Sequence, residues 1–230
     1  MSAPTESAGP QKGFLTKAAI IDRCLKDRLI ELAKDESPFG EQTPGLKSWS
    51  YDMRLGREVF LSSDKKVRNL GDREALFIQP GDFALLTTHE RLNIPPDLAA
   101  FITLRFRIAL KGLINVSGFH VDPGYQNVLF FSVYNAGPNP VVIRQGDRIF
   151  MVVFSHLDGA VEANSRSDAE FGKDDHLKAD WIAAAKGPSV NLVKLNREVE
   201  RLKYLVDLLI GVLVTVAGTI VVAMVLGVKL

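Results

Sequence analysis

The sequence is poor in cysteine and has no excess of charge of either sign. Cys24 is the only cysteine among 230 residues. One thiol can close no disulfide within the chain and build no cysteine-rich zinc site, which excludes disulfide-stabilised secreted folds and zinc-finger folds. With 28 basic and 27 acidic side chains the formal net charge is +1, so bulk charge does not indicate a nucleic-acid partner. We expect a protein of a reducing compartment, with no zinc site and no bound nucleic acid.

The motifs of several enzyme classes are also missing. The chain has no glycine-rich phosphate loop ahead of a lysine and no dinucleotide-binding fingerprint. The pair His89-Glu90 lacks the second histidine of a metalloprotease helix, and the zinc-deaminase signature needs a pair of cysteines. None of the four histidines has metal-ligand spacing, so we interpret them as surface or packing residues.

Residues 1–13 are polar and small, which predicts a flexible tail rather than a signal peptide. The end of the chain differs, because residues 208–228 contain no charged residue. At about 1.5 Å per residue this run matches a hydrocarbon slab of about 30 Å. A buried globular helix is the alternative. Basic residues are more frequent before the run than after it, which predicts a single C-terminal membrane anchor with the preceding domain in the cytoplasm.

Between these ends the pattern changes from helical to strand-like. Apolar residues at helical spacing, with Thr16 as the N-cap, predict an amphipathic helix over Phe14–Leu32. From Ser50 to Leu157, short runs rich in Val, Ile and Phe alternate with Pro-, Gly- and Asp-containing turns, which predicts an all-β barrel or jelly roll. The clearest predicted strands are Phe83–Thr88, Ala99–Leu104, Val128–Tyr134 and Arg148–Phe154.

Residues 159–188 are polar and predict a linker, with a short helix near Lys178–Lys186. Residues 189–207 then repeat apolar side chains at alternating spacings of three and four, which predicts a coiled-coil stalk leading into the membrane span. A helix packed on its own domain is the alternative. The seam consists of Leu192, Leu195, Val199, Leu202, Val206 and Leu209.

Five segments in the β-rich region resemble the family of trimeric dUTP pyrophosphatases and zinc-independent dCTP deaminases. Their order and spacing carry the resemblance, which covers residues 14–158. The segments are Ser50–Gly56 (SYDMRLG), Gln79–Leu85 (QPGDFAL), His120–Tyr125 (HVDPGY), Val133–Gly137 (VYNAG) and Arg144–Ile149 (RQGDRI). The resemblance implies a mainly β, distorted jelly roll of the β-clip type with an N-terminal helix. It also implies a homotrimer that binds a deoxynucleotide between subunits.

The resemblance places nucleotide-binding residues at several positions. Arg105 retains the arginine of the family's phosphate-binding turn, whereas Phe106 and Arg107 replace its serines. We treat Arg105 and Arg107 as neighbours on one strand face that bind an anion or line a subunit interface. Tyr125 of the substrate hairpin and Arg148 of the late motif complete the nucleotide-binding candidates.

The catalytic positions are only partly retained. Ser132 replaces the glutamate that shuttles protons in the deaminases, while dUTP pyrophosphatases also carry serine there. Asp122 aligns with the pyrophosphatases' water-activating aspartate, although it could equally cap a tight turn. Asp52 aligns with the aspartate associated with magnesium and phosphate, with a structural role as its alternative.

Two functions follow from these residues. The phosphate turn lacks the family's serines, and Ser132 replaces the deaminase glutamate. These replacements favour a membrane-anchored, non-catalytic homotrimer that senses a nucleotide or acts as a scaffold or effector. The alternative is an active deoxynucleotide hydrolase of the dUTP pyrophosphatase type, using Asp122 and a magnesium ion carried with the nucleotide. Deamination of dCTP is the least favoured activity, because a serine hydroxyl is a poor substitute for a carboxylate.

Overall fold

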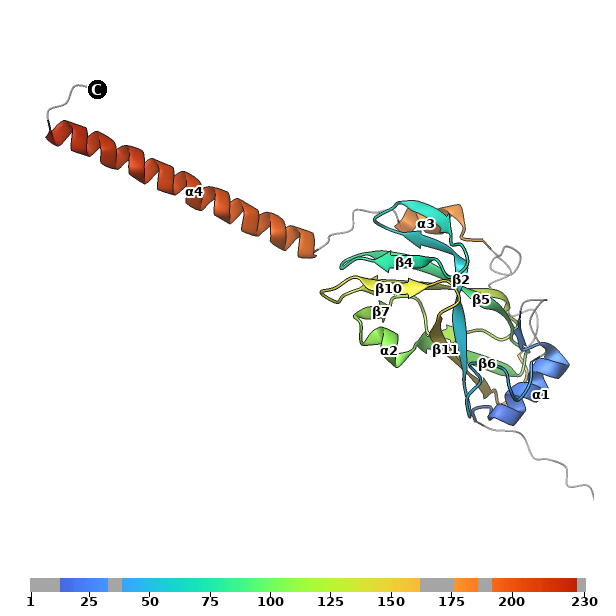
Figure 1. The fold of residues 1–230 in the computed structure, drawn as a ribbon. Helices are drawn as coiled ribbons and strands as arrows, with labels where there is room; N and C mark the ends of the chain where they lie inside the picture. Colours follow the sequence, from blue (N-terminus) through green and yellow to red (C-terminus); the bar gives the residue numbers. More distant parts are fainter. Residues whose placement is uncertain (1–12, 33–38, 162–175, 186–191, 227–230) are drawn as a thin grey trace, which may run out of the picture. The chain divides into compact units, whose positions relative to one another are not determined.

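The computed structural model describes residues 13–32, 39–161, 176–185 and 192–226. The chain divides into two compact units, residues 1–189 and 190–230, and each is described by itself (Figure 1). The first unit contains the β domain, and the second contains one long helix. The observed fold confirms the mainly β architecture with a helix before it and a long helix after it.

The first unit opens with helix α1 (Lys17–Asp27), which is shorter than predicted. Thr16 occupies the N-cap position, but its side chain makes no capping hydrogen bond. The helix ends where Arg28 adopts a left-handed conformation with φ of 54°. The predicted helix was therefore wrong beyond Asp27, and the chain continues into the short strand β1 (Ile30–Glu31).

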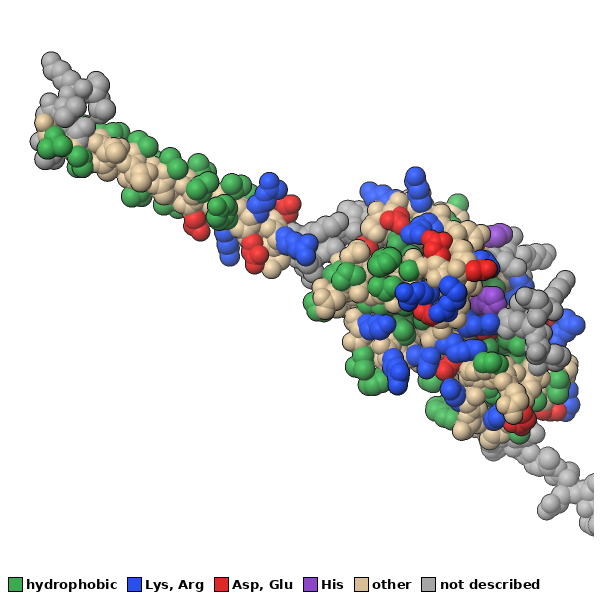
Figure 2. Space-filling model, in the orientation of Figure 1, with side chains coloured by type: hydrophobic (Ala, Val, Ile, Leu, Met, Phe, Trp, Pro, Cys, Tyr) green, Lys and Arg blue, Asp and Glu red, His purple; other side chains and the backbone are tan. Residues whose placement is uncertain are grey.

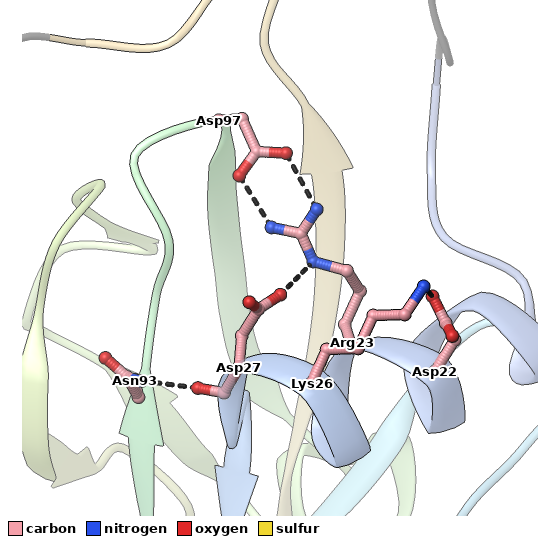
Figure 3. Close-up of polar contacts among 6 residues, drawn as sticks. All are labelled: Asp22, Arg23, Lys26, Asp27, Asn93 and Asp97. Atoms are coloured by element: carbon pink, nitrogen blue, oxygen red, sulfur yellow. Dashed lines mark hydrogen bonds and ion pairs between the residues drawn. The ribbon is translucent and has the colours of Figure 1, made fainter.

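One face of α1 packs on the β domain. Ile20 and Cys24 are buried, whereas Leu25 is 67% exposed. Burial disfavours the thiolate and raises the pKa of Cys24 to about 12. Arg23 fixes the helix, since its two Nη atoms donate to the Asp97 carboxylate at 2.8 and 2.6 Å and its Nε lies 2.7 Å from Asp27 (Figure 3).

Nine antiparallel strands form the main sheet, in the order β7-β9-β5-β2-β11-β6-β8, with β1 paired to β5 and β3 paired to β2. All four clearest predicted strands are present. The strands other than β1 are β2 (Tyr51–Leu61), β3 (Lys66–Asn69), β5 (Phe83–Asn93), β6 (Leu98–Leu104), β7 (Leu113–Asn115), β8 (His120–Val121), β9 (Gln126–Asn135) and β11 (Arg148–His156).

Alternation of buried and half-exposed residues along β5, β6 and β9 directs one side of these strands into a single apolar core. Phe131 and Phe150 meet in this core with their ring centroids 4.7 Å apart. A separate two-stranded sheet pairs β4 (Ala75–Ile78) with β10 (Val141–Arg144). The turn after β10 is closed by the Asp147 carboxylate, which accepts a hydrogen bond from the Arg144 backbone nitrogen at 2.9 Å.

The described residues of the first unit contain two further short helices. Helix α2 (Phe106–Ala109) follows β6. Helix α3 (Ala179–Ala185) forms within the segment predicted as a linker, close to the short helix expected near Lys178–Lys186. The residues just before α3 contact the β domain, because the Leu177 backbone nitrogen donates to Glu58 at 3.0 Å.

The second unit is helix α4 (Leu192–Val225), which joins the predicted stalk and membrane span without a break. Its segment Leu195–Val222 contains an 18-residue stretch that is apolar and long enough to cross a membrane, with a mean hydropathy of 2.5. On the face shown in Figure 2, charged side chains gather in the first turns and hydrophobic ones cover the rest. The proposed start of the stalk at Ser189 lies outside the described residues.

Candidate functional site

A cavity of about 190 Å³ lies beside the turn that connects β8 to β9. Complete small-molecule sites have volumes of about 300–1,000 Å³, so this cavity suits one ring-sized part of a ligand. Its walls are mostly apolar with a few polar groups at one side. The lining residues are Ile102, Ser117, Gly118, His120, Val121, Asp122, Tyr125, Leu129, Phe130 and Phe131.

Asp122 lines this cavity, and its side chain does not cap the turn between β8 and β9. The turn is closed by backbone groups, since the Tyr125 nitrogen donates to the Asp122 carbonyl oxygen at 3.2 Å and Gly124 takes a φ of 81°. The Asp122 side chain is 57% exposed, and its Oδ1 lies 3.7 Å from His120 Nε2. Among the residues that line the cavity, Asp122 has the only carboxylate and His120 the only imidazole.

Tyr125 stabilises the turn between β8 and β9 beside the cavity. Its hydroxyl donates to the Val128 carbonyl oxygen at 2.6 Å, which ties the turn to the start of β9. The ring also packs against the apolar core. Tyr125 thus fixes the turn against β9.

Asp52, Arg105 and Arg148 form a second cluster. Arg105 Nε lies 3.2 Å from the Asp52 carboxylate, and Arg105 Nη1 donates to the Arg148 carbonyl oxygen at 3.0 Å. Arg148 Nη1 in turn donates to the Asp52 carbonyl oxygen at 2.6 Å. The Asp52 side chain is only 7% exposed, so the cluster is one partly buried network of charges.

A buried ion pair beneath this cluster was not predicted. Glu90 is fully buried and accepts hydrogen bonds from Arg54 Nε at 2.6 Å, from the Arg54 backbone nitrogen at 2.8 Å and from the Tyr51 hydroxyl at 3.1 Å. The Arg148 guanidinium lies 5.8 Å from the Tyr51 ring centroid. Burial raises the pKa of Tyr51 well above its usual value, so the phenol stays a hydrogen-bond donor.

The predicted strand face shared by Arg105 and Arg107 is wrong. Strand β6 ends at Leu104, and Arg107 lies in the helical turn α2. In the same turn Phe106 is 75% exposed, and Leu110, which follows it, is 68% exposed. The turn therefore presents apolar side chains to solvent in the part of the chain that retains the phosphate-binding arginine.

Ser132 lies on β9 but does not line the cavity. Its backbone nitrogen donates to the Ser117 hydroxyl at 3.2 Å, and this serine does line the cavity. The structure thus brings Asp122 and Tyr125 together at the cavity and Asp52, Arg105 and Arg148 together in a separate cluster. Within the described residues, no group of three or more His, Cys, Asp or Glu side chains is arranged to hold a metal ion.

Comparison with known proteins gives a consistent match to the β domain. The family model described as dCTP deaminase-like matches residues 14–157. The dCTP deaminase of Pyrococcus furiosus is 34% identical over 134 residues, covering 58% of this chain and 79% of that protein. The dCTP deaminase of Idiomarina loihiensis is 36% identical over 143 residues, covering 59% of this chain and 73% of that protein.

A solved structure has the same fold. The 2'-deoxycytidine 5'-triphosphate deaminase from Agrobacterium tumefaciens superposes with a TM-score of 0.51 at 17% sequence identity. The match covers 64% of this chain and half the length of that one. The matched family region ends at residue 157, so helices α3 and α4 lie outside it.

Proposed function

Because the chain belongs to the dCTP deaminase-like family, we propose that its β domain binds a deoxynucleoside triphosphate and hydrolyses it to the monophosphate and pyrophosphate. Relatives named dCTP deaminases, at 34% and 36% identity, support a deoxynucleotide as the substrate class. They favour the catalytic alternative over the non-catalytic function that the sequence motifs favour. The observation that carries the proposal is the exposed Asp122 carboxylate at the cavity, beside His120.

The cavity volume suits one ring, such as the base, which leaves the sugar and the phosphates outside it. Asp122 accepts a proton from a water molecule that attacks the α-phosphorus, and pyrophosphate leaves as the bond to the α-phosphorus breaks. His120 Nε2 lies 3.7 Å from the same carboxylate. We expect hydrolysis rather than deamination, because position 132 carries a serine and not a carboxylate.

Asp52 does not suit a magnesium site of its own, since its buried carboxylate faces the Arg105 guanidinium. A magnesium ion would instead be held by the phosphates and water, as this ion generally is, and would neutralise the triphosphate charge. The basic side chains of the phosphate turn are Arg107, which is exposed, and Arg105, which is partly exposed and paired with Asp52.

A second candidate is binding without turnover, in a membrane-anchored homotrimer that acts as a sensor, scaffold or effector. The exposed Phe106 and Leu110 favour it, because apolar side chains in the phosphate turn offer no hydrogen bonds to a triphosphate. The uncharged run that begins at Leu208 of α4 supports the anchor, and the seam from Leu192 to Leu209 supports self-association.

The test measures pyrophosphate and ammonia released from dUTP and dCTP, with magnesium, by the full chain in detergent. We expect pyrophosphate release that Asp122→Asn abolishes and the matched variant Asp158→Asn retains, because Asp158 is exposed and outside the cavity. Release that survives Asp122→Asn would contradict the mechanism. Nucleotide-induced stabilisation without release would establish the second candidate, and ammonia from dCTP would replace both with a deaminase.

A further inference from the structure

The segment His176–Ala185 lies beyond residues 14–157, the part of the chain that the family model matches, yet it contacts the β domain. Glu58 of β2 binds the start of this segment. Glu58 Oε2 lies 2.8 Å from His176 Nδ1, and Glu58 Oε1 accepts a hydrogen bond from the Leu177 backbone nitrogen at 3.0 Å. Leu177 is only 7% exposed, so the segment has a defined position where it meets the sheet.

An aromatic contact holds the same segment further along. The Trp181 ring meets Phe130 of β9 edge to face, with ring centroids 5.0 Å apart and an angle of 69° between the planes. Phe130 alternates with the buried Leu129 and Phe131, so its ring points to the outer side of β9, away from the core. Neither ring carries a charge, so this part of the docking does not depend on pH.

The Glu58 carboxylate depends on a histidine for its charge partner. The Glu58 side chain is 16% exposed, whereas the side chain of His176 is 81% exposed. No lysine or arginine among the described residues forms an ion pair with Glu58. A largely buried carboxylate is stabilised by a nearby positive charge, and an imidazole supplies one only when it is protonated. The electrostatics of this contact therefore change near neutral pH.

The other charged groups on this side of the sheet come from the segment itself and from β5, the strand between β2 and β9. Lys178 and Asp180 belong to the segment. On β5, His89 and Arg91 alternate with buried residues, which directs them to the outer side. Strand β3 places Asn69, a neutral residue, opposite the carboxylate. Of these groups only His89 titrates near neutral pH, so it is the residue to control for.

We propose that the segment His176–Ala185 is a pH-sensitive latch on the outer side of the β domain, closed by the protonated His176 ring on the Glu58 carboxylate. Docking favours the protonated ring, because a hydrogen bond between ionised partners is the stronger one. The latch is therefore held most firmly below about pH 6.5, where an unpaired imidazole is already protonated, and weakens as the pH rises above that range. Because the segment stands in the sequence between the β strands and α4, its docking decides where the chain leaves the β domain.

Hydrogen exchange of the full chain in detergent measures the latch. The Leu177 amide exchanges when its hydrogen bond to Glu58 opens, so its protection factor, corrected for the intrinsic effect of pH on exchange, reports the docking equilibrium. We expect this protection to fall about three- to fivefold between about pH 5.5 and pH 8, a modest factor because the His176 ring is exposed. The buried Phe131 amide of β9 should show no such change, which separates the latch from the stability of the whole domain.

Matched variants separate the titrating charge from the other contacts. His176→Asn keeps a neutral donor and should make the protection of Leu177 independent of pH, as should Glu58→Gln, which removes the negative charge. Trp181→Ala should lower the protection by the same factor at every pH, because its aromatic contact carries no charge. His89→Asn removes the other histidine on this side of the sheet and should retain the full pH dependence.

Three outcomes would overturn the latch. They are Leu177 protection that does not change with pH in the wild-type chain, a change that survives in His176→Asn, and a change that His89→Asn removes. Because the His176 side chain is 81% exposed, His176→Asn leaves the β domain folded and tests the latch even where Glu58→Gln, at a largely buried position, does not fold. None of these outcomes bears on nucleotide binding, which the latch does not require.

Discussion

The Arg105 guanidinium lies 3.2 Å from the carboxylate of Asp52, so the arginine retained in the phosphate turn is already paired inside the chain. Its Nη1 atom also donates to the Arg148 carbonyl oxygen. A triphosphate that reaches Arg105 therefore meets a guanidinium whose charge is partly neutralised by Asp52 and whose orientation is fixed by these contacts. The pair stabilises the fold whether or not a nucleotide binds.

Replacing Arg105 should therefore cost stability. Arg105→Ala leaves the buried Asp52 carboxylate without its ion-pair partner, and we expect a loss of about 1–3 kcal/mol in the free energy of unfolding. The matched variant Arg107→Ala removes an exposed arginine of the next turn and should cost less than about 0.5 kcal/mol. Urea denaturation measures both values, and equal losses would show that the Asp52 pair contributes nothing.

The Arg23–Asp97 pair predicts a dependence of stability on pH. The Arg23 hydrogen bonds hold the pKa of Asp97 below its usual value, so Asp97 releases its proton more readily in the folded chain. Its contribution is present above the unfolded pKa of about 3.9 and is lost as the pH falls through the folded value.

We expect Asp97→Asn to cost about 1 kcal/mol near neutral pH, since the pair is partly exposed, and to cost less in acid below about pH 4. Chemical denaturation over this pH range measures the difference. Asp22→Asn, which breaks an exposed pair with Lys26, is the control and should change stability little at any pH. A cost for Asp97→Asn that persists undiminished in acid would contradict the linkage.

The full chain should form a homotrimer. The apolar seam of α4 and the resemblance to a trimeric family motivate this expectation. Light scattering of the detergent-solubilised protein, corrected for detergent, should give three times the 25.3 kDa mass of one chain. Leu202→Asp places a charge in the seam and should lower the stability of the assembly. A monomer at micromolar concentration would contradict the prediction.

Helix α4 should anchor the protein in a membrane with the β domain in the cytoplasm. Its segment Leu195–Val222 has the length and hydropathy of a span, and Arg197, Arg201 and Lys203 precede its uncharged part. The protein should stay with membranes through carbonate washing, and protease added outside intact cells should leave the β domain uncut. Release by carbonate would disprove the anchor, and digestion from outside would disprove the orientation.

Local sequence features predicted the strands well and the ends of elements less well. Strands β5, β6, β9 and β11 were predictable because apolar alternation and the turn residues between strands are local signals. Helix α1 was predicted too long, because Leu29 continues the apolar helical spacing although it is buried beyond the helix end. Two residues, Arg28 in a left-handed conformation and Leu29, separate the two elements.

The candidate site was predictable only where its residues are adjacent in sequence. Asp122 and Tyr125 lie in one turn, so the motif HVDPGY identifies them together. Ile102 and Leu129 reach the cavity from separate strands, and an apolar residue that lines a cavity has the same pattern as one that fills a core. The Arg23–Asp97 pair joins residues 74 positions apart, and no local signal indicates such a contact.

Because Cys24 is buried, the rate at which its thiol is labelled reports local opening of the protein. Thiol reagents attack the thiolate, which burial suppresses by raising the pKa of Cys24 to about 12. Labelling of this single cysteine therefore proceeds only while α1 is detached from the sheet. The ratio of the labelling rate to that of an unstructured peptide gives the fraction of time α1 spends undocked, without introducing any foreign probe.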